Sequence, residues 1–284
     1  MQGADVSRLI LDHIAPGILC RRRRPYVLGL CGAQGSGKST VAELVRRQLV
    51  RQGRHVALVS LDDFYLGHDE RVNLARTVHP LLAVRGVPGT HDIGLWEPVI
   101  AIAENGGGIR IPRFDKASDD RRPPEQWEGI NGPLDVLILE GWFVGARPQA
   151  RDTLIAPVNA LEREEDGDGR WRSWVNRQLA ERYQDCFDRI DSLVLLAAPS
   201  FDIVRAWRTE QEHALRHATG AGMDDQAVAA FILHYQRLTE HIMRTMPAYA
   251  ELTITLDGKR RPLAMRRESR DPTGGMSLIA QGSV

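Results

Sequence analysis

The residues from Gly32 to Ser39 have the spacing of a phosphate-binding loop. They read Gly-Ala-Gln-Gly-Ser-Gly-Lys-Ser, which fits the pattern G-x-x-x-x-G-K-[ST]. Glycines in such a loop let backbone N–H groups curl around an anion, and the N-terminus of the following helix adds a positive dipole end. Lys38 is expected to reach the terminal phosphates of ATP, and Ser39 to place its hydroxyl on Mg²⁺. We therefore predict ATP and Mg²⁺ as cofactors, held by Gly32, Gln34, Gly35, Ser36, Gly37, Lys38, Ser39 and Thr40.

The segments on either side of this loop support the same interpretation. Residues 26–31 form an apolar run that predicts a buried strand, and apolar residues recur at helical spacing over 39–51. A strand, a glycine turn and a helix start are the setting in which the motif binds phosphate, so a chance glycine turn is the weaker explanation.

Carboxylates follow two further predicted strands. The predicted strand 55–61 ends in Asp62 and Asp63, and the predicted strand 135–141 ends in Glu140-Gly141. In an open parallel sheet the ligand lies beyond the carboxyl ends of the strands. A carboxylate placed there can accept a proton from a substrate hydroxyl or hold Mg²⁺. Paired aspartates also cap helices, but beside a phosphate loop we favour the functional interpretation, with Ser39, Asp62 and Glu140 near the metal.

The remaining pattern predicts an α/β fold. We expect helices over 5–15, 171–189, 201–218 and 224–244, and further strands over 192–198 and 252–256. Residues 66–130 look irregular apart from short helices near 74–82 and 95–104. The stretch 162–170 looks like a charged surface loop, and the tail after 256 looks loose. Uniformly apolar strands separated by helices are typical of a parallel sheet covered on both faces. Without a repeat or an obvious linker, residues 1–284 are expected to form one domain.

Composition limits the class of protein. Lys and Arg together number 37, and Asp and Glu together also number 37, which argues against a nucleic-acid binder held by bulk charge. No apolar run is long enough to span a bilayer and no signal peptide is visible, so we expect no membrane association and a cytoplasmic location. The three scattered cysteines suit a reducing compartment. The basic run 21–24 is interpreted as a solvated linker rather than a phosphate site.

The combination of motifs resembles a known group of kinases. The loop, the Asp-x-Phe-Tyr unit at 62–65 and the strand ending in Glu140-Gly141 are similar to the small-molecule P-loop kinases of the uridine kinase, phosphoribulokinase and pantothenate kinase group. The resemblance implies a P-loop NTPase-type three-layer sandwich with a mostly parallel sheet and a helical lid at about 201–244. It also implies that Asp62 is the catalytic base and that Lys38, Glu140 and a lid arginine, Arg208, assist transfer.

Several middle segments are similar to D-glycerate 3-kinases. These are Arg-Gly-Val-Pro-Gly-Thr-His-Asp at 85–92, Ile-Pro-Arg-Phe-Asp-Lys-Ala at 111–117 and Glu-Gly-Trp-Phe-Val-Gly at 140–145, together with Trp207-Arg208 and Gln211-Glu212. The resemblance covers about 26–256 and implies ATP-dependent phosphorylation of D-glycerate to 3-phosphoglycerate. The charged stretch 162–170 departs from the family pattern.

A site for a small hydroxy acid needs cationic groups for the carboxylate and polar groups for the hydroxyls. We place it in the segment 66–130 and its border. The predicted acceptor residues are Asp63, Tyr65, Arg85, His91, Asp92, Arg113 and Lys116, with Arg121 and Arg122 equally well explained as surface charges. Spacing alone explains Arg208, Glu212 and Arg216 as a solvated ion-pair ladder as well as it explains a lid.

Three alternatives remain open. A nucleoside or pantothenate-type kinase would use the same loop, although the charged middle segment suits a nucleoside base poorly. A nucleotide-driven switch or GTP-binding metallochaperone would also use it. The sequence holds no Asn-Lys-x-Asp string for guanine and no clustered Cys or His for a delivered metal. A nucleotide-binding scaffold without catalysis is disfavoured because Lys38, Ser39, Asp62 and Glu140 occur together.

Overall fold

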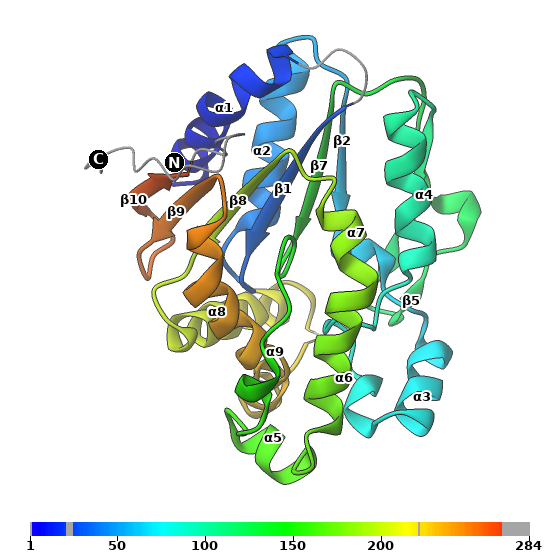
Figure 1. The fold of residues 1–284 in the computed structure, drawn as a ribbon, viewed down its shortest axis with the longest axis vertical. Helices are drawn as coiled ribbons and strands as arrows, with labels where there is room; N and C mark the ends of the chain where they lie inside the picture. Colours follow the sequence, from blue (N-terminus) through cyan, green and yellow to red (C-terminus); the bar gives the residue numbers. More distant parts are fainter. Residues whose placement is uncertain (1, 21–24, 221, 269–284) are drawn as a thin grey trace.

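A six-stranded, mostly parallel sheet forms the centre of the molecule (Figure 1). The computed structural model describes residues 2–20, 25–220 and 222–268; the basic run 21–24 lies outside the described residues. Strand order in the sheet is β10-β9-β8-β1-β7-β2, and every neighbouring pair is parallel except β9 with β10. The strands are β1 Tyr26–Gly32, β2 Val56–Ser60, β7 Val136–Gly141, β8 Ser192–Ala197, β9 Leu252–Leu256 and β10 Pro262–Arg267. Every residue of β1, β7 and β8 is buried, which explains their uninterrupted apolar sequence.

Helices cover both faces of this sheet, as predicted. Figure 1 shows α1 and α2 behind the strands and α7 in front of them. The helices are α1 Gln2–Cys20, α2 Lys38–Arg51, α3 His68–Thr77, α4 Ile93–Glu104, α5 Ala160–Glu165, α6 Arg170–Gln178, α7 Gln184–Phe187, α8 Phe201–Thr219 and α9 Asp225–Thr245. A π-helical segment, Leu179–Tyr183, joins α6 to α7, and the short 3₁₀ turn η1 spans Leu61–Phe64 after β2.

The carboxyl ends of the strands define the functional end of the molecule. In Figure 1 the arrowheads of β1, β2 and β7 point to the same end, where α3, α6, α8 and α9 gather. The phosphate loop follows β1, the 3₁₀ turn η1 follows β2, and Glu140 lies next to the last residue of β7, all at this end. The fold therefore brings together the three predicted sequence stretches.

Residues 66–130 are more regular than predicted. The helices expected near 74–82 and 95–104 are α3 and α4, with a 3₁₀ turn at Pro80–Ala83. Two small antiparallel sheets were not anticipated: β3 Ile109–Ile111 with β6 Glu128–Ile130, and β4 Phe114–Asp115 with β5 Asp120–Arg121. Their strands are two or three residues long, too short to produce a periodic pattern.

The prediction of a charged surface loop at 162–170 holds only in part, because residues 163–165, 167, 168 and 170 are exposed but residues 162–165 are helical. Helix α5 extends to Glu165, and the side chains of Glu162 and Asp166 are fully buried. Glu162 pairs with Arg237 of α9 at 2.6 Å, and Asp166 pairs with Arg172 of α6 at 2.8 Å. Buried carboxylates are stable only with such partners, and those partners lie far away or on another helix, where sequence spacing does not reveal them.

The prediction of a loose tail after residue 256 is wrong for residues 262–267. Strand β10 pairs with β9 there, at the edge of the sheet. None of its residues is buried, so it lacks the apolar signal of the inner strands.

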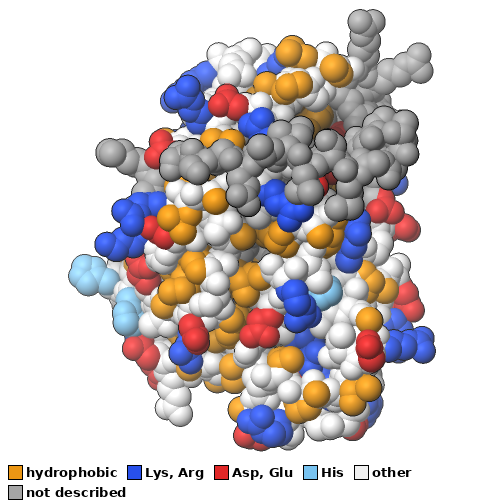
Figure 2. Space-filling view, turned by 60° about the vertical axis from the view of Figure 1, so that its left-hand side comes forward, with side chains coloured by type: hydrophobic (Ala, Val, Ile, Leu, Met, Phe, Trp, Pro, Cys, Tyr) orange, Lys and Arg blue, Asp and Glu red, His pale blue; other side chains and the backbone are white. Residues whose placement is uncertain are grey.

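The surface carries no single-sign field on the face shown in Figure 2, where Lys and Arg side chains are interspersed with Asp and Glu outside the grey atoms. Among the described residues, no helix is long and apolar enough to cross a membrane.

Candidate active site

The phosphate loop folds as its glycines require. Gly35 and Gly37 have φ angles of +71° and +84°, a region in which other residues are strained, and Gly37 caps the start of α2. A Cβ on Gly35 would lie 2.6 Å from Cβ of Trp207 and 2.8 Å from its carbonyl carbon. Helix α8 thus packs directly on the loop, and only glycine fits this contact.

Polar atoms around the loop lack partners. The hydroxyl of Ser36 and Oε2 of Glu140 are buried without a hydrogen bond to the described residues. The hydroxyl of Ser39 donates to Oε1 of Glu140 at 2.8 Å. Buried polar groups normally find partners, so this set has the character of a preformed site for a polar ligand. A carboxylate oxygen and a hydroxyl at one point also suit Mg²⁺, which prefers oxygen ligands.

A cavity of about 230 Å³ adjoins the loop. It combines residues of the loop with residues that follow β2 and β7, with the middle segment and with helices α8 and α9. Its lining is Gln34, Gly35, Gly37, Lys38, Ser39, Thr40, Asp62, Tyr65, Arg85, Lys116, Trp142, Arg208, Gln211, Phe231 and Tyr235.

Asp62 is the only carboxylate that lines this cavity among the described residues. Its Oδ1 accepts a hydrogen bond from the hydroxyl of Tyr65 at 2.8 Å, and its Oδ2 lies 2.6 Å from Nζ of Lys116. Burial raises the pKa of Asp62, but the charges of Lys116 and Lys38 outweigh it and hold the pKa below its usual range. Burial, followed by the charge of Asp62, raises the pKa of Tyr65 well above its ordinary value, so Tyr65 stays a neutral donor.

Arg85 lines the cavity and is held in place by an ion pair with a residue outside the lining. Asp119 pairs with Arg85 and also with the fully buried Arg71. Asp119 itself has a φ of +56°, uncommon for a residue with a side chain. The hydroxyl of Tyr235 donates to the Arg85 carbonyl at 2.8 Å, which ties α9 to this segment. These contacts fix the position of the Arg85 backbone at the edge of the cavity.

Two predicted acceptor residues, Asp63 and Arg113, pair with each other outside the lining. Arg113 lies 2.6 Å from Asp63 and also pairs with Glu128 of β6. Burial raises the pKa of Asp63, with the charge of Arg113 opposing it. In this arrangement the pair supports the middle segment, and neither side chain faces the cavity.

His91 and Asp92 also lie outside the lining. His91 is buried, its ring centroid lies 4.8 Å from that of Tyr65, and its Nδ1 is 2.9 Å from the hydroxyl of Tyr183. Burial lowers the pKa of His91 to about 3, so the imidazole is neutral. Asp92 accepts a hydrogen bond from Arg121 at 3.2 Å. As placed, the two residues form the wall behind Tyr65 rather than a ligand contact.

The predicted lid helix brings Arg208 to the cavity. Arg208 pairs with Glu212 one turn later, whose side chain is buried. Arg216 pairs instead with Asp225 of α9 at 2.6 Å, so the predicted ladder from Arg208 to Arg216 is only half formed. Arg208 is therefore a lining residue with an internal partner.

Sequence reasoning missed part of the lining. Four lining residues, Trp142, Gln211, Phe231 and Tyr235, had no site role assigned from the sequence. Trp142 and Tyr235 are buried, but one edge of each borders the cavity. Phe231 and Tyr235 lie four residues apart on α9, and that spacing on a helix predicted to be a lid was the available signal.

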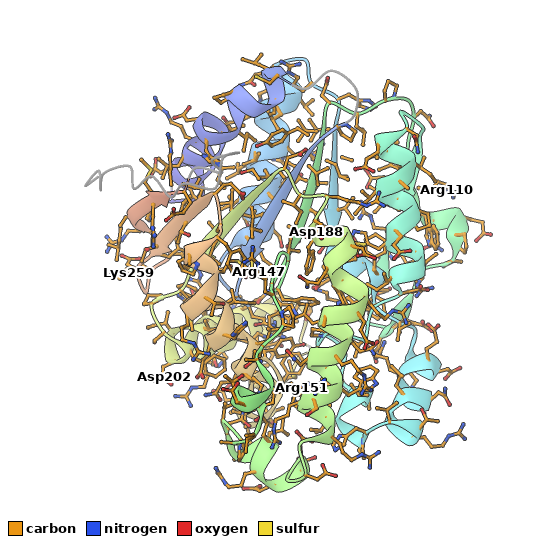
Figure 3. All side chains as sticks on the ribbon, viewed as in Figure 1. Arg110, Arg147, Arg151, Asp188, Asp202 and Lys259 are labelled. Carbon is orange, nitrogen blue, oxygen red and sulfur yellow. The ribbon has the colours of Figure 1, made fainter. Side chains whose placement is uncertain are left out.

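The turn between β9 and β10 closes the other side of the loop. Arg260 donates from Nε to the carbonyl of Gly35 at 2.6 Å, and Trp207 donates from Nε1 to the carbonyl of Gly258 at 2.8 Å. Figure 3 shows Lys259 of this turn on the same side of the molecule as Asp202 at the start of α8. The turn that leads into the unpredicted strand β10 thus contacts the phosphate loop.

A parallel sheet whose first strand runs into a phosphate loop, beneath helices that carry an arginine to the same cavity, defines a P-loop kinase fold. The model of the phosphoribulokinase/uridine kinase family matches residues 27–202, and the chain belongs to this family.

Individual relatives extend over most of the chain. It is 37% identical to the protein named uncharacterized kinase mug58 of Schizosaccharomyces pombe, over 85% of this chain and 91% of the relative. It is 30% identical to the chloroplastic D-glycerate 3-kinase of Arabidopsis thaliana, over 84% of this chain and 54% of the relative. The structure of D-glycerate 3-kinase from Cryptococcus neoformans superimposes with a TM-score of 0.74 at 25% identity, covering 93% of this chain and 98% of that one.

Proposed function

We propose that this chain transfers the terminal phosphoryl group of ATP to D-glycerate, giving 3-phosphoglycerate. The observation that carries the proposal is the composition of the cavity. The phosphate loop, one carboxylate at hydrogen-bonding distance of two other lining residues, and the cations Arg85 and Lys116 face the same space. The choice of D-glycerate as the acceptor is supported by the similarity to proteins named D-glycerate 3-kinase.

The loop residues have the nucleotide role in this proposal. Backbone N–H groups and the start of α2 hold the phosphates, with Lys38 on the terminal ones. Ser39 and Glu140 would hold Mg²⁺, with Asp62 nearby, and the ion would neutralise charge on the transferring group. Arg208 covers the same phosphate from α8.

Asp62 has the role of general base. As the oxygen of the acceptor 3-hydroxyl forms its bond to the terminal phosphorus of ATP, its proton passes to Asp62, and the bond from phosphorus to ADP breaks. The carboxylate of the acceptor is recognised by Arg85 and Lys116, because a guanidinium and an ammonium form charge-assisted hydrogen bonds with carboxylates.

The proposal is tested by ADP release from Mg²⁺-ATP with D-glycerate, L-glycerate, uridine or pantothenate. We expect D-glycerate to stimulate release and the other three compounds not to. Stimulation by none of the four would remove glycerate as the acceptor while leaving the nucleotide site in place.

A nucleoside acceptor is the second candidate, because Trp142, Phe231 and Tyr235 give the cavity an aromatic wall. Aromatic faces stack on nucleic-acid bases. The same assay decides between the two: a response to uridine but not to D-glycerate would favour the nucleoside.

A further inference from the structure

Three of the four cations that line the cavity hold a carboxylate of the chain itself. Arg85 pairs with Asp119, Arg208 with Glu212 and Lys116 with Asp62, whereas Lys38 forms no ion pair with another described residue. The partners differ in one respect. Asp119 and Glu212 lie outside the lining, but Asp62 lines the cavity and is the proposed base. The contact between Lys116 and Asp62 therefore bears directly on the chemistry.

Both carboxylate oxygens of Asp62 accept a hydrogen bond in this arrangement. One carboxylate oxygen accepts from Tyr65 at 2.8 Å and the other from the ammonium of Lys116 at 2.6 Å. A carboxylate that carries a cation is a weak proton acceptor, because the proton must compete with the positive charge. For Asp62 to act as a base, Lys116 has to move away.

Lys116 is placed so that it can move. Its side chain is 60% exposed, and it lies in the turn between β4 and β5. The far end of that turn is anchored, since Asp119 pairs with the buried Arg71. Lys116 is a single point charge on a flexible stem, unlike Arg113, which is fixed between Asp63 and Glu128. The turn is therefore held in place at Asp119, while the ammonium group of Lys116 is free to change partners.

We propose that Lys116 exchanges carboxylates: it pairs with Asp62 while the acceptor is absent, and it transfers to the carboxylate of the incoming hydroxy acid. The inference rests on the proposed function and adds a coupling to it. An anionic acceptor releases the base that its own hydroxyl needs. Water and neutral alcohols leave Asp62 paired, so ATP bound alone is protected from hydrolysis.

Acceptor-free hydrolysis tests the exchange, with Lys116→Met as the variant that keeps length and removes charge. We expect this variant to hydrolyse Mg²⁺-ATP without acceptor about tenfold faster than the wild-type protein, which corresponds to about 1.4 kcal/mol of barrier. Stimulation by D-glycerate should fall at the same time.

Three further variants make the result specific. Lys116→Arg keeps the positive charge and should hydrolyse ATP more slowly than Lys116→Met. Arg110→Met removes a charge from β3, where Figure 3 shows Arg110 at the outer edge of the molecule, and should leave hydrolysis unchanged. Adding Asp62→Asn to Lys116→Met should abolish the extra hydrolysis, since the released base is then gone.

The outcomes separate this inference from the proposed function. If Lys116→Met hydrolyses ATP no faster than wild type, the exchange is overturned even where D-glycerate is the acceptor. If the variant is faster but wild-type protein does not respond to D-glycerate, the masking of Asp62 is supported and the proposed acceptor fails.

Discussion

The two halves of the cavity treat their charges in opposite ways. The nucleotide half consists of the loop Gly32–Thr40 and of Glu140 at the end of β7, which accepts a hydrogen bond from Ser39 but does not itself line the cavity. Among the described residues, Lys38 has no ion-pair partner, and Ser36 and Glu140 each keep one oxygen without a hydrogen bond. The acceptor half, formed by Asp62, Tyr65, Arg85, Lys116 and the lining residues of α9, comes from four separate stretches. Its charges are already paired within the chain.

This difference has a physical meaning. A site that always receives the same polyphosphate gains from open, prearranged donors, since no reorganisation is needed when the ligand arrives. A site that must respond to its acceptor gains from internal pairs that the ligand replaces, at a cost in affinity. The predictions below separate the two halves.

The largest effect is expected from Asp62→Asn. This variant should bind ATP normally, because the nucleotide half is intact, and should lose about 10²–10⁴-fold in phosphoryl transfer, the usual contribution of a general base. ATP binding is measured by titration calorimetry and transfer by ADP release. Retained turnover would mean that Asp63 or another residue is the base. The proposed division of the cavity into two halves would then be wrong.

The acceptor half should depend on a buried ion pair that lies outside the cavity lining. Glu162 accepts hydrogen bonds from Arg237 at 2.7 and 2.6 Å, and Arg237 lies on α9, which carries Phe231 and Tyr235. Glu162→Gln should lower the free energy of unfolding by about 3–5 kcal/mol, because it leaves a buried charge without a partner. Urea unfolding measures it.

Glu164→Gln is the matched control, since Glu164 is exposed on the same helix. Its effect should stay within about 0.5 kcal/mol. Equal losses in the two variants would show that the buried pair does not hold α9.

Low pH should lower the free energy of unfolding through His91, which packs against Tyr65. Burial lowers the pKa of His91 from 6.5 to about 3. The unfolded chain takes up this proton below about pH 6.5 and the folded chain only near 3, so the free energy of unfolding falls as the pH drops through that window. At pH 4 the loss from His91 is roughly 3 kcal/mol.

The contribution of His91 is measured by urea unfolding of wild type and of a His91 variant at pH 7 and at pH 4. His91→Phe should lose less stability between the two pH values than wild type, because the other titrating groups are shared. An equal loss would mean that His91 is protonated in the folded protein.

The smallest effect concerns the nucleotide half. Gly35→Ala should lower the free energy of unfolding by about 1–3 kcal/mol and weaken ATP binding, since a side chain at φ +71° is strained and meets the backbone of Trp207. Gly53→Ala is the control: its φ is +80°, but nothing lies within 4 Å of an added Cβ. It should cost about 1 kcal/mol and leave ATP binding unchanged. Equal ATP affinity in both variants would contradict the close packing of α8 on the loop.

The same contrast explains what could be read from the sequence. The nucleotide half is contiguous and built on backbone geometry, so Gly35, Gly37, Lys38 and Ser39 could be assigned from spacing alone. The inner strands were equally clear because both faces are buried. Asp62, Arg85, Lys116 and Arg208 were also anticipated, and the fold places all four on the cavity.

What sequence spacing could not give depends on partners distant in the chain. Asp63 and Arg113 were read as separate ligand groups but pair across 50 residues, and Glu162 was read as solvated but pairs across 75. The short strands β4 and β5 and the exposed strand β10 lack apolar periodicity. Tertiary pairing decides each of these cases, and no local pattern encodes it.

The central claim is that the acceptor half recognises a carboxylate. It is tested most directly by comparing D-glycerate with glycerol, which offers the hydroxyls without the charge, as acceptors for Mg²⁺-ATP. We predict that kcat/KM for D-glycerate exceeds that for glycerol by about 10–150-fold or more, the equivalent of about 1.5–3 kcal/mol for a hydrogen bond to a charged group. Equal values for the two acceptors would contradict the account.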